Sequence, residues 1–180
     1  MTRPRDELER LARETEAEEA LGALPAGPRP SPGRRASLLA SLEPASRFSA
    51  FRERLAHLID VLPERADALL RHAAEAGGDG WYPDRVPGVK LFDFDGGPRV
   101  AGADCGLVTM APGTSYPMHR HRGDEWALVL QGRAVTDDGT VWSPGDLIHS
   151  PTGSAHGFEV QGELPFVFAI VLHEGIEPVR

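Results

Sequence analysis

The chain has 180 residues, a formal net charge of −8, and an ordinary composition with 41% hydrophobic and 26% charged residues. The acidic balance argues against nucleic acid as a partner, because nucleic-acid-binding proteins present basic surfaces. Cys105 is the single cysteine and no segment approaches the roughly 18 apolar residues of a membrane span, which excludes an intrachain disulfide and disfavours a membrane partner. No apolar run follows the charged residues near Met1, so we expect no secretory signal and a cytoplasmic protein.

Residues 1–34 are expected to form a charged helix followed by a linker. Residues 4–21 are rich in Glu and Arg and carry only a thin stripe of leucines, which predicts a weakly docked helix or a frayed arm. Proline and glycine crowd residues 22–34, a composition that predicts a segment without regular structure.

Residues 35–80 have the pattern of a helical hairpin. A short apolar patch at 38–42 precedes apolar residues at helical spacing that predict an amphipathic helix over about 45–61. Pro63 begins a second predicted helix, which Gly77 and Gly78 close. The apolar faces of this hairpin cover either the following domain or a dimer partner, or else residues 36–75 contact a regulatory protein partner.

Residues 81–180 are broken into short apolar runs by glycine, proline and aspartate. Such runs predict β-strands, without intervening helices, over residues 89–94, 105–111, 125–130, 146–150, 157–161 and 165–172, with weaker strands near 99–101 and 132–136. Short strands at this spacing favour a sandwich or barrel.

Four residues in this part could hold a metal ion. His119 and His121 are two residues apart, so they share one face of an extended strand. Glu125 follows a Gly-Asp turn signal and can return toward that face, and His156 lies behind its own glycine and proline. Three imidazoles and one carboxylate suit zinc, iron, manganese or nickel.

The spacing of these residues resembles the two cupin signature motifs. The first motif is matched by Gly113, His119, His121, Glu125 and Gly132. The second motif is matched by Gly145, Pro151, Gly153 and His156. The resemblance implies an all-β double-stranded β-helix, the cupin jelly-roll barrel, with an N-terminal α-helical extension and a metal inside the barrel. The second motif usually ends in asparagine where this chain has Val160, a position that is not usually a metal ligand.

The segment from residue 35 onward also resembles ChrR-type cupins, which include anti-sigma factors. The resemblance rests on Arg47 to Phe51, on Trp81 with the following Pro87-Gly88, and on the Pro117 to Glu125 motif. It implies a sensor or regulatory module with a mononuclear three-histidine, one-glutamate site. Residues 1–35 contain no histidine or cysteine, so the N-terminal zinc-binding motif of the anti-sigma members is missing. The alternative is a small metalloenzyme, a dioxygenase or a lyase or isomerase, that acts on a small organic molecule in the barrel.

Two further side chains are candidates for catalysis. Tyr116 could reach the barrel mouth as an acid or base, or could simply be a packed aromatic. His149 could line the pocket as a proton shuttle, or could be an exposed strand residue. Because cupin barrels often dimerise by sheet packing, we also expect a homodimer.

Overall fold

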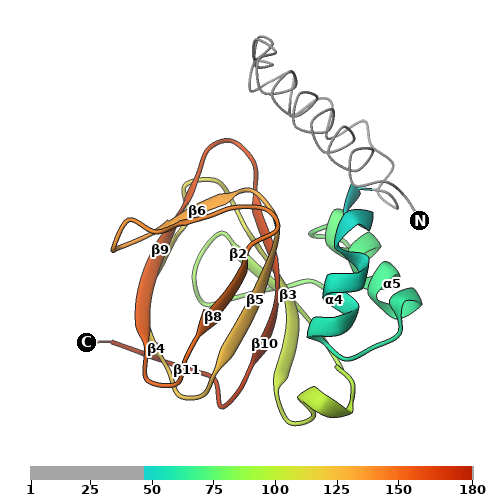
Figure 1. The fold of residues 1–180 in the computed structure, drawn as a ribbon. Coiled ribbons are helices and arrows are strands. Elements are labelled where there is room, and N and C mark those ends of the chain that lie inside the picture. The colour runs from blue at the N-terminus through green and yellow to red at the C-terminus, as the bar shows by residue number, and fades with distance from the viewer. Residues whose placement is uncertain (1–46, 180) are drawn as a thin grey trace, which may run out of the picture. The chain divides into compact units, whose positions relative to one another are not determined.

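The computed structural model describes residues 47–179 and arranges their strands into two antiparallel sheets (Figure 1). The helix expected at 4–21, the linker at 22–34 and the helical patch at 38–42 lie outside the described residues. Among the residues that are described, no helix is long and apolar enough to cross a membrane.

Each sheet takes strands from distant parts of the chain. The larger sheet has the order β1 (Tyr82–Pro83), β2 (Val89–Phe94), β3 (Asp104–Met110), β10 (Phe166–Leu172), β5 (Glu125–Gln131) and β8 (Leu147–Ser150). The smaller sheet has the order β11 (Ile176–Pro178), β4 (Ser115–His121), β9 (Ala155–Gln161), β6 (Arg133–Thr136) and β7 (Val141–Trp142). This is the jelly-roll arrangement of a cupin barrel, as the sequence predicts.

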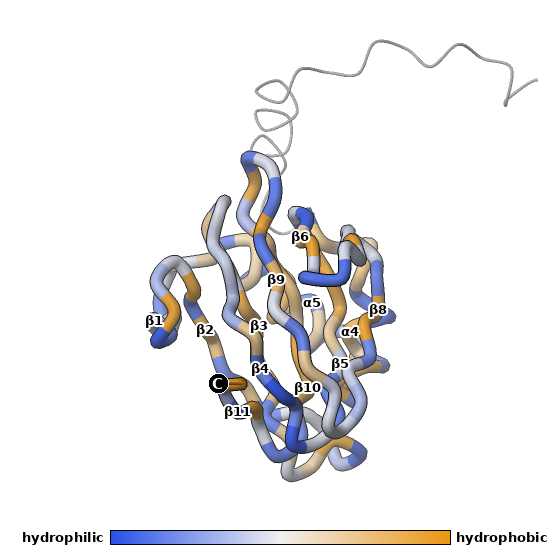
Figure 2. Tube along the Cα trace, turned by 90° about the vertical axis from the view of Figure 1, so that its left-hand side faces the viewer, coloured by the Kyte–Doolittle hydropathy of each residue, from blue (hydrophilic) through white to orange (hydrophobic). Residues whose placement is uncertain are grey.

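Alternate residues of each strand face the barrel interior, and most of these residues are apolar. One core cluster joins the two sheets and includes Val108 and Met110 of β3, Val129 of β5, Phe158 of β9 and Phe166 of β10. Against this background Figure 2 shows a strongly hydrophilic end of β4, in contrast to the hydrophobic course of β10. Of the polar residues there, His119 and His121 are buried, whereas Arg120 between them is exposed.

Two short helices pack on the outer face of the larger sheet. A 3₁₀ turn, η1 (Ser49–Phe51), leads into α4 (Arg52–Leu58), and α5 (Pro63–Ala74) follows with its proline in the first turn. Their buried side chains form a second core cluster with Leu107, Leu128 and Val167 on β3, β5 and β10. The apolar faces of the described helices therefore cover the barrel, one of the interpretations that the sequence left open.

The ends of the helices differ from the prediction. The first helix ends near Leu58 rather than residue 61, because Asp60 adopts a left-handed conformation with φ 57°. The second helix ends at Ala74, before the glycine pair that was expected to close it.

The strand predicted near 99–101 is wrong. Pro98–Val100 form a 3₁₀ turn, η2, because the carboxylate of Asp60 holds Arg99 through the backbone N–H at 2.8 Å and the guanidinium Nε at 2.7 Å. The backbone N–H of Gly97 also donates to the carbonyl of Ile59 at 2.8 Å. These bonds fasten the turn to the end of α4 and remove it from either sheet.

Gly132 connects the two sheets between β5 and β6. Its φ of 79° is in the left-handed region, and a Cβ atom there would lie 2.5 Å from the carbonyl oxygen of Pro165. Only glycine meets both demands, which explains its place in the motif.

Candidate metal centre

Three histidines of the smaller sheet converge inside the barrel. His119 and His121 lie on one face of β4, and His156 on β9 is the direct cross-strand partner of His119. One ring nitrogen from each histidine lies within 4.8 Å of the others. The structure thus brings these three side chains together, and they could hold a metal ion.

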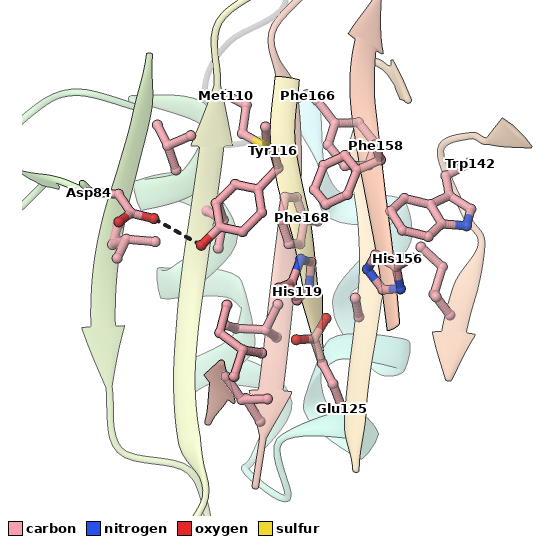
Figure 3. A pocket seen from close by; sticks show the side chains of 18 residues that line it. Asp84, Met110, Tyr116, His119, Glu125, Trp142, His156, Phe158, Phe166 and Phe168 are labelled. Carbon is pink, nitrogen blue, oxygen red and sulfur yellow. Dashed lines mark hydrogen bonds between the residues drawn. The ribbon is translucent and has the colours of Figure 1, made fainter. Parts of the chain in front are cut away.

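Glu125 approaches the same cluster from the larger sheet. It is the first residue of β5, and its Oε2 lies 3.7 Å from Nδ1 of His121, with only 15% of its side chain exposed. Figure 3 shows its carboxylate pointing toward His119 and His156. The four residues singled out in the sequence are therefore neighbours in space.

The imidazoles are prepared to act as ligands. Burial lowers the pKa of His119, and it lowers the pKa of His121 and of His156 to about 4, so all three rings are neutral near pH 7. Nδ1 of His119 lies 3.0 Å from the carbonyl of Pro117, which favours a proton on that nitrogen and leaves Nε2 free for a metal.

His121 supports the fit to a metal most directly. Its side chain is fully buried, and neither ring nitrogen has a hydrogen-bond partner among the residues that the structure describes. A buried imidazole without partners is costly, and a coordinated ion would satisfy one of its nitrogens.

Burial also changes the acidity of Glu125. It raises the pKa of this carboxyl to about 7, because the apolar barrel disfavours the charged form. Without a cation nearby, Glu125 can therefore hold or release a proton near neutral pH.

A cavity of about 270 Å³ adjoins the cluster. His119, Glu125 and His156 line it together with Tyr116 and Asp84, and most of the remaining lining residues are apolar (Figure 3). This is the form of a site for a small molecule, with a few polar groups converging in apolar surroundings.

A β-bulge aims Tyr116 into this cavity. Residues three apart on a regular strand face opposite sides, yet Tyr116 and His119 both line the cavity. Between their partners Phe158 and His156 on β9 the register shifts, so that two residues of β4 oppose one. The extra residue shifts the alternation of side chains along β4 by one position, so that Tyr116 faces the same side as the histidines.

Tyr116 is paired with Asp84, a residue that sequence reasoning missed. The phenol donates to Oδ2 of Asp84 at 3.2 Å, and its ring stacks on Phe158 with 5.6 Å between centroids. Burial and the nearby Asp84 raise the pKa of Tyr116 to about 12, so the hydroxyl keeps its proton at neutral pH. Asp84 lies 32 residues earlier in the chain, just after β1, and no local sequence signal connects the two.

His149 is an exposed strand residue, the second of the two interpretations that the sequence left open. It is not one of the residues that line the cavity, whereas its neighbour Ile148 is. On β8 it opposes Trp126, and the two rings stack with centroids 4.0 Å apart on the outer face. The alternation of β5 explains this placement, because Glu125 and Ala127 face inward and Trp126 outward.

Comparisons with known proteins agree with this fold. Residues 106–172 match the family described as Cupin domain. An oxalate decarboxylase from Arthroderma benhamiae is 34% identical over 88 residues, which are 44% of this chain and 19% of that protein. The chain thus spans about a fifth of the length of this relative.

Two solved structures are similar in part. A protein of unknown function with a cupin-like fold from Ralstonia eutropha is 22% identical, over 51% of this chain and 59% of that one, with a TM-score of 0.46. An acetylacetone dioxygenase from Acinetobacter johnsonii is 13% identical, over 57% and 74% of the two chains, with a TM-score of 0.47.

Proposed function

We propose that this chain, in which residues 106–172 form a cupin domain, is a metalloenzyme that acts on a small organic molecule inside its barrel. One observation carries the proposal. One nitrogen from each of three neutral imidazoles lies within 4.8 Å of the other two, beside a cavity of about 270 Å³ that is also lined by a buried carboxyl group.

His119, His121 and His156 would hold the ion, with Glu125 as a fourth ligand. Zinc, iron, manganese or nickel suits this donor set, and a bound ion would polarise or activate a substrate oxygen. The apolar lining excludes bulk water and strengthens electrostatic interactions inside the cavity. The Tyr116 hydroxyl, whose proton is donated to Asp84, can accept a hydrogen bond from the substrate.

The metal site is tested by elemental analysis. We expect the purified protein to retain about one transition-metal ion per chain, and the double substitution His119→Ala with His121→Ala to lose it. His57→Ala is the matched control, because His57 is an exposed histidine on α4. Unchanged metal content in the double variant would refute the site.

Turnover is tested on protein loaded separately with each of the four metals. Aerobic oxygen consumption with diketones, thiols and flavonols would support a dioxygenase, and conversion without oxygen would support a lyase or isomerase. Oxalate joins the panel because of the Arthroderma benhamiae relative. Complete inertness with every metal would overturn the enzymatic proposal and leave the metal site standing.

A regulatory module of ChrR type is a second candidate. It is favoured because three strands of the larger sheet contact the helices on one face and line the cavity on the other. On β3, β5 and β10, Leu107, Leu128 and Val167 contact the helix cluster, while the adjacent Val108, Ala127 and Phe168 line the cavity. A ligand in the barrel could therefore alter the support of α4 and α5, and with it a partner surface within residues 36–75.

Hydrogen exchange distinguishes the two candidates. A regulator predicts that zinc or a bound ligand slows amide exchange in α4 and α5 as well as in the barrel. An enzyme without this role predicts that exchange in α4 and α5 slows by no more than the gain in global stability of the same samples, measured by urea unfolding. A pulldown that recovers only the protein itself would also count against a regulator.

A further inference from the structure

The cavity has polar groups at two places with different hydrogen-bonding capacity. His119, Glu125 and His156 form the proposed metal end. Tyr116 and Asp84 form a second group, in which the tyrosine hydroxyl points at the aspartate (Figure 3). A molecule bound at the metal end would contact this pair with its other end.

The Tyr116–Asp84 pair offers acceptors only. A tyrosine hydroxyl has one proton, and Tyr116 donates it to Oδ2 of Asp84. Oδ1 of Asp84 accepts the backbone N–H of Arg85, which fixes the orientation of the carboxylate. The lone pairs left over on the phenol and the carboxylate can only accept hydrogen bonds.

The charged groups that line the cavity also disfavour an anionic ligand. Asp84 and Glu125 line it, whereas no lysine or arginine is among its described lining residues. A divalent ion would offset these two carboxylates, so a substrate carboxylate would bring an uncompensated negative charge into apolar surroundings. Burial of an unpaired charge is strongly unfavourable.

The size limits the ligand further. A cavity of about 150 Å³ is sufficient for one benzene molecule, so about 270 Å³ admits a single ring with a few substituents or an aliphatic molecule of that size. On the basis of the proposed metal site, we propose that the cavity selects a small uncharged molecule whose hydroxyl donates to the Tyr116–Asp84 pair, and that it rejects carboxylates.

Three probes of similar size test this selection on the full chain loaded with zinc. Benzyl alcohol can donate a hydrogen bond, benzyl methyl ether cannot, and benzoate carries a negative charge. Titration calorimetry should give dissociation constants about tenfold or more lower for benzyl alcohol than for either of the others, as expected for one buried hydrogen bond to a charged group.

Asp84→Asn should reverse part of this preference. The backbone N–H of Arg85 keeps the amide oxygen on its side, so the amide nitrogen faces Tyr116 and donates to the phenol. The tyrosine hydroxyl is then free to point its proton into the cavity, where it can donate a hydrogen bond to a carboxylate. We expect the preference for benzyl alcohol over benzoate to shrink about tenfold or more.

Asp93→Asn is the matched control. Asp93 likewise accepts a tyrosine hydroxyl, from Tyr82, but both residues are exposed and neither lines the cavity. This variant should keep the selectivity of the parent protein. A change as large as that of Asp84→Asn would overturn the assignment of specificity to Asp84.

The zinc content of the same samples separates the two proposals. If zinc is retained and benzoate binds as tightly as benzyl alcohol, or benzyl alcohol gives no binding at millimolar concentration, the proposed selectivity is wrong and the metal site stands. If zinc is not retained, the proposed function itself fails.

Discussion

Glu125 places a carboxyl group beside three imidazoles in an apolar barrel, and its protonation depends on whether a cation is present. Its pKa in the folded protein is raised to about 7 from an ordinary value near 4.5. Because the folded-state pKa is higher than the unfolded-state pKa, the protonated carboxyl contributes stability to the metal-free fold. This contribution is fully present below the unfolded-state pKa and is lost as the pH rises through about 7. A bound cation would reverse the sign, because it favours the carboxylate.

Glu125→Gln tests this dependence because glutamine does not titrate. In metal-free protein the free energy of unfolding of the parent should fall relative to the variant by about 2–3 kcal/mol between pH 5 and pH 8. Urea unfolding of chelator-treated samples at the two pH values measures the difference. Titration of the histidines is common to both proteins, so parallel pH profiles would contradict the assigned pKa.

At the scale of residues, the sequence predicts what lies close along the chain. His119, His121, Glu125 and His156 are recognisable because their spacing matches the cupin motifs. Asp84 is not, because its partnership with Tyr116 depends on the pairing of distant strands. The position of His149 stayed open because alternation along β8 alone does not say which side chains face inward, and only its pairing with Trp126 decides that.

At the scale of elements, the presence of an apolar run determined which strands could be predicted. The six- and seven-residue strands β2, β3 and β10 have apolar runs long enough to recognise, and their bounds match within a residue. The two-residue strands β1 and β7 and the three-residue strand β11 carry too few residues for a periodic signal. The bulge in β4 also lacks a local signal, since it is defined by the register with β9.

The connection between β5 and β6 gives a test at this scale. Gly132→Ala should cost more than the roughly 1–2 kcal/mol of a left-handed alanine, because the new methyl group would also meet Pro165 at 2.5 Å. Gly139→Ala is the matched control, with a φ of 85° and no atom within 4 Å of the added carbon. Urea unfolding should therefore rank Gly132→Ala as clearly less stable than Gly139→Ala, and equal losses would contradict the close approach.

At the scale of the described molecule, residues 47–179, the helices and the barrel share one core. Leu55 of α4 and Leu69 of α5 belong to the same buried cluster as Leu107, Leu128 and Val167 of the larger sheet. Elements that share a core are expected to unfold together. The N-terminal extension expected from the sequence is thus joined to the barrel over its described part.

Leu55→Ala tests this joint stability. Leu55 is fully buried, so its truncation should lower the free energy of unfolding by about 2–5 kcal/mol and keep a single transition for helix and barrel signals. Leu62→Ala is the control, because Leu62 is 74% exposed and its loss should change stability by less than about 0.5 kcal/mol. Circular dichroism and tryptophan fluorescence that separate into two transitions would contradict the shared core.

Trp142 gives the site a natural optical reporter. Its indole lines the cavity with its centroid 5.2 Å from that of His156, whereas Trp126 stacks on His149 at the outer face and Trp81 packs with the helix cluster. A paramagnetic ion such as Mn²⁺ should therefore quench the emission of Trp142 far more than that of the other two tryptophans. The part of the emission that disappears in Trp142→Phe then reports metal occupancy directly, without labels and before any substrate is known.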